Sequence, residues 1–147
     1  MPVSIRDVAQ RAGVSVGTVS NVLNRPGEVS ADSVERVSKA IDELGYVRND
    51  AARKLRAGVS TTVGFIVLDG QNPFYNELVR GAEDEASSHG IAILYGNTDE
   101  DPSREKVYLD LFCEQQVRGL LLAPFGDVLP HLRRLRSAGI ATVLVDR

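Results

Sequence analysis

Several features that mark common protein classes are missing from this sequence of 147 residues. Its single cysteine, Cys113, excludes an internal disulfide framework and a cysteine-based zinc site. No apolar run approaches the length of a membrane span, and the opening residues Met-Pro-Val-Ser-Ile-Arg contain no apolar signal-peptide core. We therefore expect a soluble, cytoplasmic protein with no membrane partner.

Motifs for enzymatic chemistry are also scarce. The first predicted strand is followed by DGQNPFY. This segment is neither the G-x-G-x-x-G fingerprint of dinucleotide-binding folds nor the G-x-x-x-x-G-K-[ST] loop that binds phosphates. No combination of His, Cys and carboxylate motifs suggests a catalytic site. The sequence thus predicts a protein that is not an enzyme, with no cofactor and no metal.

The net charge of −3 is unevenly distributed along the chain. Residues 1–58 hold nine Lys and Arg against seven Asp and Glu, whereas residues 59–147 hold eight against thirteen. The amino-terminal part is therefore slightly basic and the remainder is acidic. This modest asymmetry suits a head that binds nucleic acid on a body that avoids it.

Residues 5–24, IRDVAQRAGVSVGTVSNVLN, are the most informative stretch of the chain. They predict two short helices joined by a turn, in which Gly13 adopts a positive φ and Ser15 caps the second helix. The polar outer face of the second helix fits the major groove of DNA, although an ordinary helical hairpin has similar surface residues. The predicted apolar seam between the helices comprises Val8, Ala9, Ala12, Val14, Val19 and Leu23.

A third helix and a linker complete the amino-terminal part. Ser30 caps a predicted helix over 31–44, so that a helix-turn-helix domain spans residues 1–46. Residues 47–61 lose apolar periodicity and carry a cluster of Arg and Lys. A helix over about 49–56 is too short to be stable alone, so this segment is either a plain linker or a helix that forms on binding a partner.

From residue 62 the pattern becomes α/β. Apolar strands alternate with helices of 10–15 residues, which is typical of βαβ units and a parallel sheet. Because the chain ends one residue after a buried strand, we expect a fragment in which the domain 62–147 is truncated. The predicted strands are 62–68, 91–96, 118–124 and 140–146, and the predicted helices are 74–88, 103–116 and 128–138.

The motifs together resemble the lac-repressor (LacI/GalR) family of bacterial transcription regulators. The matching segments are IRDVAQRAGVSVGTVSNVLN, VSADSVERVSKAIDELGYVRN, AARKL, TVGFIVLDGQNPFYNELVRGAE, RGLLLAP and VLVDR. The resemblance implies an α plus α/β fold, with a three-helix helix-turn-helix head, a hinge helix and a partial parallel-sheet lobe like that of periplasmic binding proteins.

The same resemblance implies a function. We expect a sequence-specific DNA-binding regulator, a repressor that binds a palindromic double-stranded DNA operator as a homodimer. A small effector, sugar-like or nucleoside-like, would bind the body and change the affinity for the operator. The alternative is a sugar-binding module without a DNA role, which the α/β part alone would allow.

Residue roles in DNA binding follow from the resemblance. Val16, Gly17 and Asn21 fall at base-reading positions. Ala52 and Leu55 lie on the hinge helix, where the family inserts a leucine wedge into the minor groove and bends the duplex. The positions that contact phosphates or support those contacts are Ser4, Ser15, Thr18, Ser20 and Asn24.

Two residues depart from the family pattern. Arg48 stands where the family usually has proline, so that either the hinge is looser or Arg48 adds a phosphate contact. Gly17 places no side chain at a base-reading position. Specificity should then depend on Val16, which can touch a thymine methyl group, and on Asn21, which can pair with adenine.

A candidate effector site lies at the carboxyl ends of the predicted strands, where open α/β sheets bind ligands. Asn72 and Pro73 are good residues for starting a helix, and the two aromatic residues after them are either core residues or ligand contacts. In the family, aromatics at this place stack on the effector. The predicted effector-binding residues are Asp69, Phe74, Tyr75, Asp146 and Arg147.

Overall fold

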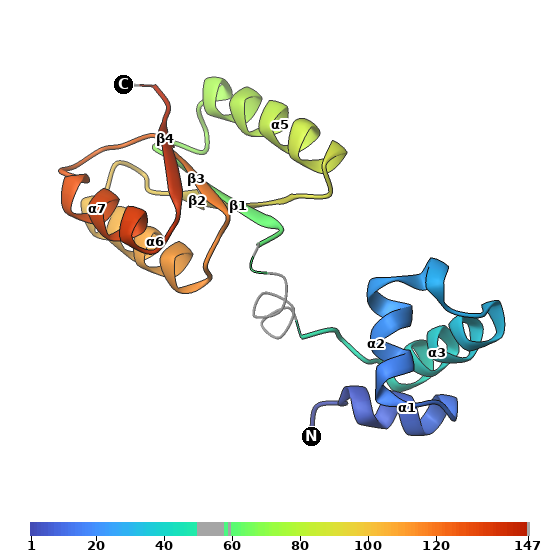
Figure 1. Ribbon diagram of the computed structural model, residues 1–147. Coiled ribbons are helices and arrows are strands. Elements are labelled where there is room, and N and C mark those ends of the chain that lie inside the picture. The colour runs from blue at the N-terminus through green and yellow to red at the C-terminus, as the bar shows by residue number, and fades with distance from the viewer. Residues whose placement is uncertain (50–57, 59, 147) are drawn as a thin grey trace. The chain divides into compact units, whose positions relative to one another are not determined.

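The computed structural model describes residues 1–49, 58 and 60–146 of the chain (Figure 1). The chain divides into two compact units, Met1–Arg53 and Lys54–Arg147. Each unit is described by itself. The predicted hinge helix falls on the segment 50–57 and so lies outside the described residues.

The first unit contains α1 (Ile5–Ala12), α2 (Val16–Asn24), the short 3-10 helix η1 (Pro26–Glu28) and α3 (Ala31–Leu44). The helix ends follow ordinary capping chemistry, including the predicted roles of Gly13, Ser15 and Ser30. Ser4, Ser15 and Ser30 each accept a hydrogen bond from a backbone N–H in the first turn of their helix. Gly13 and Gly45 end α1 and α3 with φ angles of 65° and 63°, which glycine adopts without a steric penalty.

A small apolar core joins the three helices of this unit. Val8, Val19 and Val37, one from each helix, are fully buried. All the residues of the predicted seam belong to this core or pack against it, with Val14 and Leu23 partly buried, and Val22 is a further buried residue on the last turns of α2. Val19 and Val22 are three residues apart and share the inner face of the helix, which leaves the opposite face exposed.

The second unit contains a parallel sheet with the strand order β2-β1-β3-β4. Its elements in chain order are β1 (Thr62–Val67), α5 (Pro73–Ser88), β2 (Ala92–Asn97), α6 (Pro102–Glu114), β3 (Gly119–Leu122), α7 (Leu129–Ser137) and β4 (Ala141–Leu144). All of them begin and end within two residues of the predicted bounds. A helix follows each of the first three strands, which is the connection that parallel neighbours require.

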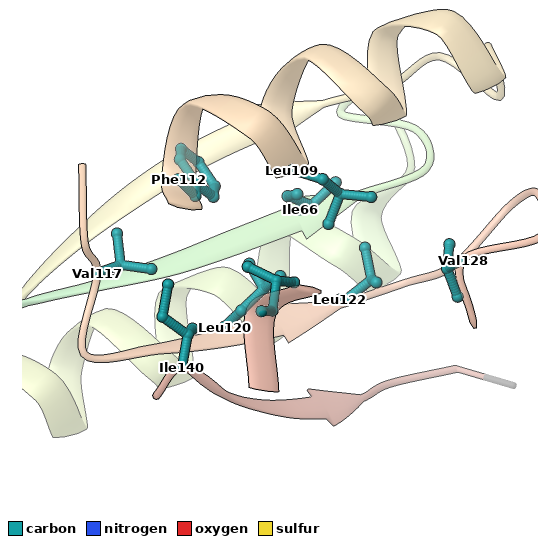
Figure 2. Packing of buried hydrophobic residues seen from close by; sticks show 9 residues of the cluster. Ile66, Leu109, Phe112, Val117, Leu120, Leu122, Val128 and Ile140 are labelled. Carbon is teal, nitrogen blue, oxygen red and sulfur yellow. The ribbon is translucent and has the colours of Figure 1, made fainter. Parts of the chain in front are cut away.

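Helices cover both faces of this sheet, with α5 against one face and α6 and α7 against the other (Figure 1). The central strand β1 alternates between the two layers. Ile66 packs beside Leu109 and Phe112 of α6 (Figure 2), whereas Phe65 and Val67 lie in the cluster under α5. Burial on both faces explains why the sequence of β1 is continuously apolar. The parallel order brings the loops after all four strands to one edge of the sheet.

Two smaller observations concern Cys113 and membranes. Cys113 is half-buried and packs against the cluster formed by α6, α7 and the sheet. Within the described ranges, none of the helices is both long enough and apolar enough to cross a membrane.

Candidate nucleic-acid interface and effector site

The turn between α1 and α2 fixes how the second helix begins. The N–H of Val14 donates to the carbonyl of Ala9 at 3.1 Å, across the left-handed Gly13. The Oγ of Ser15 then accepts the N–H of Thr18 at 3.0 Å, and the two hydroxyl oxygens lie 2.9 Å apart. Ser15 and Thr18, both predicted to face DNA, therefore also hold the first turn of α2.

Ser4 makes the equivalent contacts at the start of α1. Its backbone N–H and its hydroxyl donate to the carboxylate of Asp7 at 2.8 and 2.7 Å, and its Oγ accepts the N–H of Asp7 at 3.3 Å. The hydrogen bonds from Ser4 lower the pKa of Asp7. A phosphate contact by the Ser4 hydroxyl would have to replace its bond to Asp7.

The face of α2 opposite its buried valines is open. Val16 is 41% exposed, and Gly17 and Asn21 are exposed beside it. Among the described residues, a Cβ atom placed on Gly17 would meet only the hydroxyl oxygen of Ser15, at 3.6 Å, so residues 1–49 leave the space above that position open. On the last turns of the helix, the amide of Asn24 donates to the carbonyl of Ser20 at 2.9 Å. The predicted base-reading residues thus share one exposed helix face, with Ser20 and Asn24 at its carboxyl end.

Three of the predicted site residues cannot be placed in this way. Ala52 and Leu55, the predicted hinge contacts, and Arg147, a predicted effector contact, lie outside the described residues. Their roles remain predictions from the sequence.

The predicted effector residues of α5 separate into one exposed and one buried aromatic ring. Phe74 is 49% exposed, whereas Tyr75 is only 4% exposed and belongs to the cluster between α5 and the sheet. The rings meet edge to face with their centroids 5.2 Å apart. The sequence left open whether these two aromatic residues are core residues or ligand contacts. Tyr75 is a core residue, whereas the ring of Phe74 is exposed and open to a ligand.

Tyr75 also joins α5 to the residue that follows β4. Its hydroxyl donates to a carboxylate oxygen of Asp146 at 2.6 Å. Burial of the ring is the main cause that raises the pKa of Tyr75 to about 12, and the hydrogen bond and charge of Asp146 add to it. Asp146 itself has a φ of 54°, an uncommon value for a residue with a side chain. Two predicted effector residues far apart in sequence are thus brought together.

The loops after β1 and β2 are tied to each other at the same edge of the sheet. Asp69 accepts the N–H of Gln71 at 2.8 Å, which shapes the loop after β1. The side-chain oxygen of Asn97, at the end of β2, accepts the N–H of Gly70 at 3.1 Å, and its amide donates to Asp99 at 2.7 Å. Asp69 is half-buried, and its carboxylate already accepts one hydrogen bond, from the backbone of Gln71.

Glu105 holds the loop after β3, and it was not predicted from the sequence. The side chain is 4% exposed, and its two carboxylate oxygens accept the N–H groups of Phe125 and Gly126 at 2.9 and 3.2 Å. The ring of Phe125 is 46% exposed at this edge. A glutamate in the first turn of a helix is common, so the sequence around Glu105 does not show that it binds a loop. Only its contacts with Phe125 and Gly126, about 20 residues later, reveal this role.

Comparison with known protein families identifies both units. Residues 4–49 match the family described as bacterial regulatory proteins, lacI family. Residues 60–147 match the family described as periplasmic binding proteins and sugar binding domain of LacI family. The chain belongs to the LacI family.

Individual members of the LacI family are similar along nearly the whole chain. The ribose operon repressor of Halalkalibacterium halodurans is 40% identical over 144 residues, which are 98% of this chain and 43% of that protein. A crystal structure of a LacI-family transcriptional regulator from Silicibacter pomeroyi is 30% identical, with a TM-score of 0.83 over 99% of this chain and 44% of that one. The chain therefore spans less than half the length of the relatives that it matches.

A lac repressor structure belongs to the same group of relatives. The lac repressor dimer bound to operator and the anti-inducer ONPF is 27% identical, with a TM-score of 0.76 over 99% of this chain and 45% of that one. These relatives are regulatory proteins and not enzymes. The helix-turn-helix head and the partial periplasmic-binding-protein-like lobe are thus both features of the LacI family.

Proposed function

We propose that this chain is the DNA-binding head and part of the effector-binding body of a transcriptional repressor. The head reads half of a palindromic operator, and two copies of the protein bind one operator as a dimer. A sugar-like or nucleoside-like effector binds the body and changes the affinity for DNA. A protein with this function works in the cytoplasm.

The observation that supports DNA reading most strongly is the exposed face of α2. Val16 and Asn21 stand on this face beside the open position of Gly17, while Val19 and Val22 anchor the opposite face. A short helix that is fixed by a tight turn and exposes small and polar residues fits a major groove. The match of residues 4–49 to the regulatory family supports the same role.

The effector role is supported by the edge of the sheet where the strand-ending loops meet. Phe74 offers an exposed ring for stacking, and Asp69 and Asp146 place carboxylate oxygens at loops after β1 and β4. Carboxylates accept hydrogen bonds from the hydroxyl groups of sugars and nucleosides. Residues 60–147 match a family that is described by sugar binding, which supports a sugar-like effector.

The proposed function is tested by selecting DNA with the 147-residue chain from a library of random duplexes. A repressor should enrich one short sequence, and its affinity for that sequence should fall steeply as salt concentration rises, because phosphate contacts release counterions. Binding without sequence enrichment would contradict a sequence-specific repressor, and the absence of measurable, salt-dependent binding to DNA would favour a sugar-binding module.

The predicted wedge is tested on the DNA that this selection identifies. Leu55→Ala should lower affinity by about tenfold or more, because loss of the apolar wedge removes the bend that the other contacts need. The control is Val107→Ala, which truncates another apolar residue, 63% exposed on α6, and should leave affinity unchanged. Equal affinity of both variants and the parent chain in a gel-shift titration would exclude the wedge.

A further inference from the structure

Arg48 follows α3, and its guanidinium reaches back to the carboxyl end of α2. One of its terminal nitrogens donates to the backbone carbonyl of Leu23 at 3.2 Å, and the other donates to the side-chain oxygen of Asn24. These partners lie about 25 residues earlier in the sequence. Because the guanidinium fork is planar and rigid, two bonds from one arginine fix both distance and orientation.

The bond to Asn24 places Arg48 in a network that covers the last turn of α2. The amide nitrogen of Asn24 donates to the carbonyl of Ser20 at 2.9 Å and lies 3.3 Å from its hydroxyl oxygen. Arg48 takes the remaining oxygen of the same amide. The amide nitrogen and the amide oxygen of Asn24 are thus both hydrogen-bonded, and the Asn24 side chain links Arg48 to Ser20.

Arg48 also brings a positive charge to the end of α2. The last carbonyl groups of a helix lack partners within the helix and carry partial negative charge. No basic residue stands in the last turn of α2 itself, and Arg25, its C-cap residue, pairs with Glu28 at 3.6 Å. Arg48 therefore adds to the positive charge at this helix end and donates directly to one of its carbonyl groups.

We propose that Arg48 is a positioning residue for DNA reading. It fastens the chain that leaves the head to the end of α2, so that the helix and the start of the linker keep one relative geometry. The guanidinium acts through Leu23 and Asn24 and does not itself contact phosphate. This inference rests on the proposed role of α2 in DNA reading.

The test compares Arg48→Ala and Arg48→Lys in the 147-residue chain, on the selected sequence and on unrelated DNA. A positioning role predicts that Arg48→Ala loses about tenfold in specific affinity, which corresponds to about 1.4 kcal/mol of binding free energy. Affinity for unrelated DNA and the dependence on salt concentration should be unchanged. The variant should remain folded at the assay temperature, although loss of its two hydrogen bonds lowers the melting temperature. Arg48→Lys should recover at most part of the loss, because an ammonium group cannot reproduce the two-pronged contact.

The Asn24 partner allows a double-mutant cycle. The variant that carries both Arg48→Ala and Asn24→Ala should lose less specific affinity than the sum of the two single losses, since the two residues share one contact. Arg36→Ala serves as the charge-matched control, because Arg36 pairs with Asp32 at 3.1 Å on α3. It should bind the selected sequence as the parent chain does.

Three results would overturn the assignment. Arg48 would be a phosphate contact if Arg48→Ala lost equal affinity on both DNAs and the slope of log affinity against log salt concentration fell by about one. Unfolding of the head at the assay temperature, with a matching loss of binding on both DNAs, would make its role purely structural, and unchanged binding would remove the role altogether. If the parent chain selects no sequence, the proposed function fails instead, so the two failures are distinguishable.

Discussion

Replacing Glu105 by alanine should destabilise the second unit of the chain. Glu105 stands on α6 with 4% of its surface exposed, and its carboxylate accepts the backbone N–H groups of Phe125 and Gly126. Nothing in an alanine side chain can accept these two bonds. The loop after β3 would therefore lose its attachment to α6.

The size of the effect follows from the two hydrogen bonds. A bond to a charged group contributes about 1.5–3 kcal/mol, so two such bonds set an upper limit of about 3–6 kcal/mol. Phe125 and Gly126 are exposed residues, and water can reach their N–H groups once the carboxylate is gone. We therefore expect Glu105→Ala to lower the free energy of unfolding by about 2–4 kcal/mol. Glu105→Gln keeps one acceptor oxygen and should lose about half as much.

Urea denaturation followed by tyrosine fluorescence measures this loss. The chain has no tryptophan, and three of its four tyrosines, at positions 75, 95 and 108, lie in the second unit and report on it. The control is Glu114→Ala, which removes an exposed glutamate from the last position of the same helix and should change stability by less than about 0.5 kcal/mol. If Glu105→Ala is as stable as this control, the reasoning is refuted.

Two further predictions concern the core and the edge of the sheet. Gly64→Ala should cost about 1–3 kcal/mol of stability, because a Cβ there would lie 2.5 Å from the ring of Phe112. Gly81→Ala, in open space on α5, should instead raise stability by up to about 1 kcal/mol in the same denaturation experiment, because alanine is the better helix former. Tyr75, with a pKa near 12, should stay protonated well above pH 10 in an absorbance titration, so its bond contributes stability below about pH 10 that is lost as the pH rises towards 12. Asp146→Asn should lower the pKa of Tyr75 without returning it to 10, since burial, the largest cause, remains; an unchanged titration would contradict this.

The features that could be predicted from the sequence depend on neighbouring residues. Serine before a helix and glycine after one are local signals, and they mark the starts of α1, α2 and α3 and the ends of α1 and α3. The alternation of apolar strands and amphipathic helices likewise predicted the order and bounds of every element of the sheet. These signals work because capping and periodicity act within a few residues.

The contacts that could not be predicted join residues that are distant in sequence. Glu105 meets a loop 20 residues later, Arg48 meets α2 about 25 residues earlier, and Tyr75 meets Asp146 across 71 residues. No local pattern distinguishes these side chains from exposed ones of the same type. Burial within a helix was also hard to predict at one place. The sequence pattern did not show that Val22 would be more deeply buried than Leu23, because this depends on how α2 packs against the other helices.

The bond between Tyr75 and Asp146 occupies one acceptor site of a carboxylate that belongs to the proposed effector site. A carboxylate has about four lone-pair sites, so a hydroxyl group of an effector could donate to Asp146 beside the tyrosine hydroxyl that already donates at 2.6 Å. A group that only accepts hydrogen bonds would find no donor on this carboxylate. If the proposed effector binds here, Asp146 would therefore favour molecules that present a hydroxyl group to it.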